Sequence, residues 1–180
     1  MPSCAVRGAQ ESGNVTLAVP ASFLLPSARL LALDVGSLKV GFAISSPRGG
    51  APPLVEGLGW VRAPPRLAGA PARSAYFAAV AAELASRHDA GGALLGWPLL
   101  PTGAPGASCA AVLAVRDALA ASAPLLPLLL WDERGSTVAG RAALRAVRGG
   151  GPLPPEWRGG RVDEAAAMQI LRSFFAAHGA

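Results

Sequence analysis

The sequence predicts an α/β fold in which a mixed five-stranded sheet contains an antiparallel hairpin and is flanked by helices. An apolar run at residues 30–33 is followed, after a tight turn, by another at 40–44, as in a β-hairpin. Further short apolar runs alternate with longer segments of helical periodicity, which is typical of parallel strands joined by crossover helices. Hydrophobic residues make up 52% of the 180 residues and charged residues only 15%, so the chain has a globular composition.

The first half of the chain is expected to continue with one more strand, a helix and a buried strand. The strand is predicted at 54–61, after a glycine- and proline-rich loop at 47–53. A helix is predicted at 72–88, because apolar residues recur there at helical spacing. A short buried strand is predicted at 91–97, and Pro98 ends it.

The second half is expected to contain three helices and the last strand. A helix is predicted at 108–121 and a strand at 125–131. That strand is apolar on both faces, which is typical of a central parallel strand covered by helices. Two more helices are predicted at 137–147 and 162–177, separated by a flexible loop at 149–160.

These elements predict one domain at residues 29–177. Residues 1–28 are predicted to be a flexible N-terminal extension or a transit peptide, because the segment is rich in serine and poor in acids. The corresponding location is the cytoplasm for a bacterial protein, and a chloroplast or mitochondrion for a eukaryotic one.

Cysteine content and hydropathy exclude several classes of protein. Cys4 and Cys109 have neither the spacing of a zinc site nor that of a disulfide framework, so a reducing compartment is expected. No apolar run reaches the roughly 20 residues that a transmembrane helix needs, so no membrane partner is predicted. The net charge of +5 favours a polyanionic partner such as nucleic acid.

Acidic residues follow or begin apolar segments at three separate places. Asp34 ends the first predicted strand, and Asp132 and Glu133 follow the last one. Asp163 begins the final helix, on the apolar stripe that must pack against the sheet. Open α/β sheets build their sites where the carboxyl ends of the strands meet. We therefore expect these acids to lie together at that edge.

Grouped carboxylates repel one another unless a cation holds them together. Oxygen ligands favour Mg²⁺ or Mn²⁺, and two such ions can clamp the attacking and leaving oxygens during phosphodiester hydrolysis. The pattern therefore favours a metal-dependent nuclease. Ordinary structural roles stay open for each acid, with Asp163 as a helix N-cap and Glu133 as an ion-pair partner of Arg134.

Polar residues near these acids are candidates for binding the phosphates of a substrate. Lys39 and Arg134 are the nearest cations, and a guanidinium suits bidentate phosphate recognition. Ser37 lies in the hairpin turn and belongs to the same side of the site. Thr137 begins a helix after Ser136, where a hydroxyl binds phosphate or caps the helix.

Four segments together resemble the YqgF/RuvX family of Holliday junction resolvases and pre-16S rRNA processing nucleases. They are LDVGSLKVGFAIS from Leu33, LLGWPL at 94–99, WDERGST at 131–137 and RVDEAAAMQIL at 161–171. The resemblance implies an RNase H-like fold, a bound Mg²⁺ or Mn²⁺, and an acidic triad of Asp34, Glu133 and Asp163. It also implies an endonuclease for structured RNA or branched DNA that matures the 5′ end of pre-16S rRNA or resolves Holliday junctions, as a monomer or a homodimer.

Two other functions stay open at this point. The chain departs from the family pattern at Trp97, Leu100, Thr102, Gly135 and Ala139, which is compatible with a catalytically weak or inactive protein that binds nucleic acid. The Asp-Val-Gly-Ser turn also resembles the phosphate-binding hairpin of the actin and sugar-kinase superfamily, which suggests an ATP-binding module. That superfamily uses two such domains, and this chain has the length for one.

Overall fold

The computed structural model describes residues 19–49, 51–100, 102, 104–133, 136–147, 149, 152, 153, 157 and 160–179, without the side chains of residues 136 and 137. Its sheet has the strand order β3-β2-β1-β4-β5. β1 (Leu30–Val35) pairs antiparallel with β2 (Lys39–Arg48), which pairs antiparallel with β3 (Ala51–Arg62). β4 (Gly92–Trp97) lies parallel to β1, and β5 (Leu128–Asp132) lies parallel to β4. This confirms the predicted mixed five-stranded α/β sheet.

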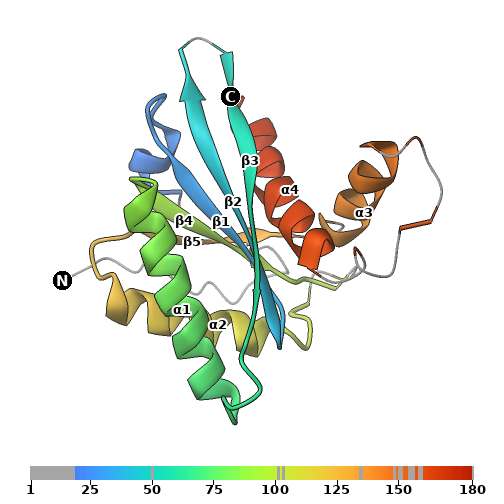
Figure 1. Cartoon of the computed structure of the whole chain (residues 1–180). Helices are drawn as coiled ribbons and strands as arrows, with labels where there is room; N and C mark the ends of the chain where they lie inside the picture. The colour runs from blue at the N-terminus through green and yellow to red at the C-terminus, as the bar shows by residue number, and fades with distance from the viewer. Residues whose placement is uncertain are drawn as a thin grey trace.

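Helices cover both faces of the sheet (Figure 1). The crossover helices α1 (Ala70–Arg87) and α2 (Cys109–Ser122) pack against one another on one face. On the other face, α4 (Gly160–His178) lies across β1, β2 and β3, and α3 (Ser136–Val147) packs on the outside of α4. None of these helices is long and apolar enough to cross a membrane within the described part of the chain.

Alternation of side chains along the strands gives the sheet two different cores. On β1, Leu31 and Leu33 point towards α1 and α2, where their core includes Leu119. Leu30 points the other way and packs with Ile170 of α4. We call these two sides the α1/α2 face and the α4 face.

The segment before β1 joins the α4 face. A short 3₁₀ helix at Ala21–Leu24 carries Phe23, which is fully buried and stacks edge to face on Phe174. Packed residues therefore begin upstream of residue 29, where the sequence places the start of the domain. Residues 1–18 lie outside the described residues, so the flexible extension and the transit peptide remain predictions.

Two details of the predicted elements are wrong. The predicted loop at 47–53 is mostly strand, since β2 continues to Arg48 and β3 begins at Ala51. Pro52 and Pro53 are tolerated in β3 because it is an edge strand and lacks one neighbour. The last strand begins at Leu128 instead of residue 125, and it is the other edge of the sheet instead of a central strand. It is apolar because each of its faces still contributes to one of the two cores.

Candidate active site

Asp34 lies near the end of β1 on the α4 face, opposite Gly41 of β2. Burial, and then the charge of Asp163, raise the pKa of Asp34 from 3.8 to about 7. A hydrogen bond from the carboxyl group of Glu133 acts in the opposite direction and lowers that pKa. The result is a carboxyl group that exchanges its proton near neutral pH.

Glu133 follows β5 and continues its pairing, because its N–H donates to the carbonyl oxygen of Trp97 over 3.2 Å. Its carboxylate lies above Gly96, where a Cβ atom would be only 2.0 Å from Oε2 of Glu133. Oε2 is buried and has no hydrogen-bond partner in the described part of the chain. Burial, followed by the charge and the hydrogen bond of Asp34, raises the pKa of Glu133 from 4.5 to about 8.

Asp163 lies in the first turn of α4, directly above β2. A Cβ atom on Gly41 would lie 2.1 Å from the carbonyl carbon of Asp163, so only glycine lets the helix approach this closely. Burial raises the pKa of Asp163, while the positive charges of Lys39 and Arg141 lower it. These two cations therefore face the acidic edge of the sheet.

The structure unites the predicted acids only in part. Asp34 and Glu133 share a hydrogen bond, whereas Asp163 acts on Asp34 through its charge. Among the described residues, no group of three or more His, Cys, Asp or Glu side chains has the spacing of a metal site. Asp132 is exposed, and the alternation of β5 puts it on the α1/α2 face with Leu130. The central pair is therefore Asp34 and Glu133.

The predicted phosphate-binding residues have mixed outcomes. Lys39 begins β2 close to Asp163, and its Nζ lies 5.6 Å from the centre of the Trp60 ring. Ser37 is exposed in the turn that the Gly36 N–H closes on the carbonyl oxygen of Lys39. Arg134 lies outside the described residues, as does the side chain of Thr137. Their substrate contacts remain predictions.

Sequence reasoning missed the glycines that let α4 lie on the sheet. Besides Gly41, Gly57 leaves room for Glu164, whose Oε1 would be 2.2 Å from a Cβ atom at that position. The same Oε1 accepts a hydrogen bond of 3.0 Å from the N–H of Gly59. Gly57 and Gly59 stand at alternate positions of β3, which is a usable sequence signal. The presence of 22 glycines in the chain weakens that signal.

Arg141 was also missed, although its charge acts on Asp163. The signal for it is the spacing of Arg141 and Arg145, which puts two cations on one face of a helix that begins three residues after Glu133.

This arrangement allows two kinds of chemistry. A pair of carboxyl groups with pKa values of about 7 and about 8 can accept and release a proton near neutral pH. The same oxygens are hard ligands that suit a divalent cation, which would remove the repulsion between the charged forms.

Known proteins match this chain over most of its length. Residues 28–177 match the family described as RuvX: Holliday junction resolvase. A protein from Kineococcus radiotolerans named "Putative pre-16S rRNA nuclease" is 36% identical over 144 residues, which cover 79% of this chain and 69% of the relative. A protein of the same name from Nocardia farcinica is 32% identical over 148 residues, or 81% of this chain and 76% of the relative.

The fold also matches a solved structure, that of Thermus thermophilus RuvC. The TM-score is 0.54 at 16% sequence identity, and the match covers 84% of this chain and 96% of that chain. This similarity supports the RNase H-like fold that the sequence motifs imply.

Proposed function

This chain belongs to the RuvX family of nucleases, and from that premise we propose that it is a divalent-metal-dependent endonuclease acting on structured nucleic acid. One observation carries the proposal: the half-buried pair of Asp34 and Glu133, in which the buried Oε2 atom of Glu133 lacks a hydrogen-bond partner in the described part of the chain. Structural carboxylates are normally satisfied when buried. An unsatisfied carboxylate oxygen where β1 and β5 end therefore fits a site that binds a ligand.

The donor atoms present fit Mg²⁺ or Mn²⁺. Asp34 and Glu133 would hold the ion, and Asp163 is the third candidate ligand. Both pKa values of the pair are raised, so a positive charge between them would favour the ionised forms. When bound, such an ion supplies polarisation of the phosphoryl group and activation of water.

The residues of the chain have distinct parts in this proposal. The ends of β1 and β5 position the carboxyl groups of Asp34 and Glu133, and the contact of α4 with Gly41 places Asp163 near Asp34. The raised pKa values allow a proton to leave or return at these carboxyl oxygens near neutral pH. Lys39 adds a positive charge near Asp163 that attracts the phosphodiester backbone.

The proposed substrate is a precursor of 16S rRNA, cleaved at its 5′ end, or a four-way DNA junction. The two relatives described above carry the name of a pre-16S rRNA nuclease, and the family description names the Holliday junction. The net charge of +5 supports either polyanion.

The decisive experiment compares cleavage of an rRNA precursor and a four-way DNA junction, with and without Mg²⁺. We expect one substrate to be cleaved only with the metal, and Asp34→Asn to lower the rate on the order of 10³-fold. Asp163→Asn should also lose activity. Glu83→Gln, which changes an exposed side chain of α1, should keep it.

Full activity of both Asn variants would contradict the assignment of the acids. Binding of either nucleic acid without cleavage under any metal would instead make this protein a nucleic-acid-binding member of the family.

A further inference from the structure

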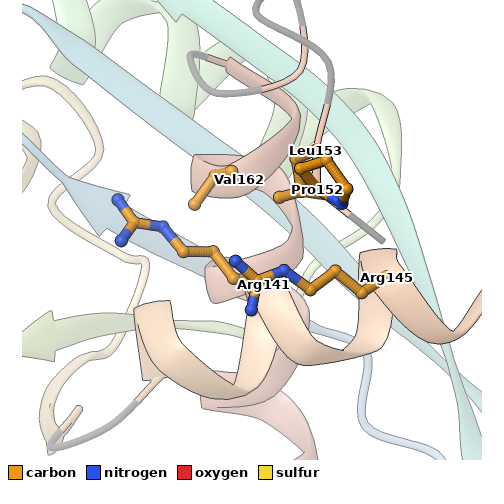
Figure 2. Close-up of a pocket in the computed structure, with 5 residues that line it drawn as sticks. All are labelled: Arg141, Arg145, Pro152, Leu153 and Val162. Atoms are coloured by element: carbon orange, nitrogen blue, oxygen red, sulfur yellow. The ribbon is translucent and has the colours of Figure 1, made fainter. Parts of the chain in front are cut away.

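A pocket of about 240 Å³ lies between α3 and α4 (Figure 2). Arg141 and Arg145 of α3 line it, together with Val162 of α4 and the loop residues Pro152 and Leu153. Leu153 and Val162 are almost fully buried. The lining is almost entirely apolar, so the arginines contribute their aliphatic stems to the wall, while both side chains remain exposed.

No ion pair neutralises Arg141 or Arg145 in the described part of the chain, although the charge of Arg141 also acts on Asp163. Neither makes a hydrogen bond or an ion pair within the part of the chain that the structure describes. Figure 2 shows Arg141 and Arg145 extending from α3 in the same direction, towards the N-terminal end of that helix. Two like charges at this spacing repel each other, and an anion between or beside them would relieve that repulsion.

Close packing of the helices ties this pair to the active site. A Cβ atom on Gly140 would lie 3.0 Å from the backbone nitrogen of Ala166, so α3 lies directly on α4. Arg141 follows that contact, and Val162 in the pocket wall precedes Asp163. The charge of Arg141 reaches Asp163 and lowers its pKa. An anion held by Arg141 would therefore lie near the carboxylates.

We propose that Arg141 and Arg145 form a phosphate-binding subsite that holds the backbone of the substrate strand next to the Asp34–Glu133 pair. The inference rests on the proposed nuclease function and names residues that position its substrate. Clustered carboxylates repel a phosphodiester, so a nuclease needs fixed cations beside them. Guanidinium groups suit this role because they are permanently charged and donate two parallel hydrogen bonds to phosphate oxygens. The aliphatic stems of both arginines line the apolar pocket, and the side chains remain exposed, so their charged ends are accessible to a phosphate.

The test measures binding of the full chain to a labelled RNA hairpin and a labelled four-way DNA junction, in EDTA, between about 50 and 200 mM salt. Each phosphate contact contributes about 0.7 to 0.9 to the slope of log K against log salt. Arg141→Met/Arg145→Met keeps the apolar stems and removes both charges, and it should lower the slope by about 1.4 to 1.8. Arg141→Lys/Arg145→Lys should keep most of the slope. Arg87→Met, on the exposed surface of α1, is the matched control.

A lower slope on either probe, restored by the lysine pair, supports the subsite and distinguishes RNA from DNA backbones as its ligand. An unchanged slope on both probes, or a loss that the lysine pair does not restore, overturns it. Cleavage assays of the same variants keep the two proposals apart. Normal cleavage by wild-type protein with an unchanged slope in the Met variant removes the subsite alone. A slope effect without any cleavage by wild-type protein removes the proposed function alone.

Discussion

The two faces of the sheet are built from different residues and have different properties. The α1/α2 face is filled with aliphatic and aromatic side chains such as Phe42, Leu95 and Leu119. At the acidic edge, the α4 face instead carries glycines opposite the helix and carboxyl groups between the elements. A sheet face can therefore provide stability along most of its area and hold costly buried acids at one edge.

Apolar packing on the rest of the sheet makes the acids at its edge tolerable. Taking a carboxylate out of water is expensive, and here burial raises the pKa of Asp34, Glu133 and Asp163. The folding energy that offsets this cost comes from the apolar residues elsewhere in the two cores. We therefore expect function and stability to respond separately to mutations on the two faces.

The sharpest contrast comes from one matched pair of cavity mutations. Leu119 on the α1/α2 face and Ile170 on the α4 face are both fully buried. Replacing either with Ala should lower the free energy of unfolding by about 3 kcal/mol. Only Ile170→Ala should also slow cleavage, by about tenfold, because Ile170 Cδ1 and Glu133 Oε2 approach the same point above Gly96.

Denaturant unfolding and single-turnover cleavage check this pair, at a temperature where both variants are folded. Equal losses of cleavage rate in the two variants would break the distinction between the faces.

The close approach of α4 to the sheet gives the next largest effect. Gly41→Ala places a methyl group against the backbone of Asp163, so α4 must shift. We expect a loss of about 2 kcal/mol in the free energy of unfolding together with a strong loss of cleavage. Gly91→Ala is the control, because the nearest atom to its Cβ is 3.8 Å away. A Gly41→Ala variant that keeps both stability and cleavage would show that the contact is dispensable.

The raised pKa values predict a pH dependence of stability. Asp34 and Glu133 keep their protons in the folded state up to about pH 7 and about pH 8, whereas their ordinary values are 3.8 and 4.5. The folded state thus binds more protons across this range, so the free energy of unfolding falls as pH rises from about 4 to about 8. In EDTA, the thermal midpoint should fall by about 4 °C more in wild-type protein than in Asp34→Asn.

Thermal unfolding at several pH values measures that difference, with Glu83→Gln as a charge-removal control on exposed α1. Adding Mg²⁺ at about pH 8 should restore the midpoint of wild-type protein and leave Asp34→Asn nearly unchanged. Identical pH profiles of wild-type and Asp34→Asn would contradict the burial of this carboxyl group.

The sequence predicted where the acids lie, but it did not predict the order of the strands or the close packing of α4. Apolar runs that end in acids predicted the position of Asp34 and Glu133, because the end of a strand is visible in the local sequence pattern. The same runs did not reveal sheet order, since the strand ending at Asp132 is as apolar as a central strand yet lies at an edge. The approach of Gly41 to Asp163, and the docking of Phe23, depend on contacts between distant segments that no local pattern encodes.

The smallest expected effect comes from a residue on the α4 face that lies far from the acids. Ser45 is fully buried on β2, and its Oγ accepts a hydrogen bond of 2.8 Å from the N–H of Leu30, at the end of the sheet away from the acids. Ser45→Ala leaves that N–H without a partner and should cost about 1 kcal/mol of unfolding free energy, with cleavage unchanged. Ser122→Ala, at the half-exposed end of α2, should cost less. A loss of cleavage in Ser45→Ala would mean that the whole α4 face, and not only its acidic edge, sets the geometry of the active site.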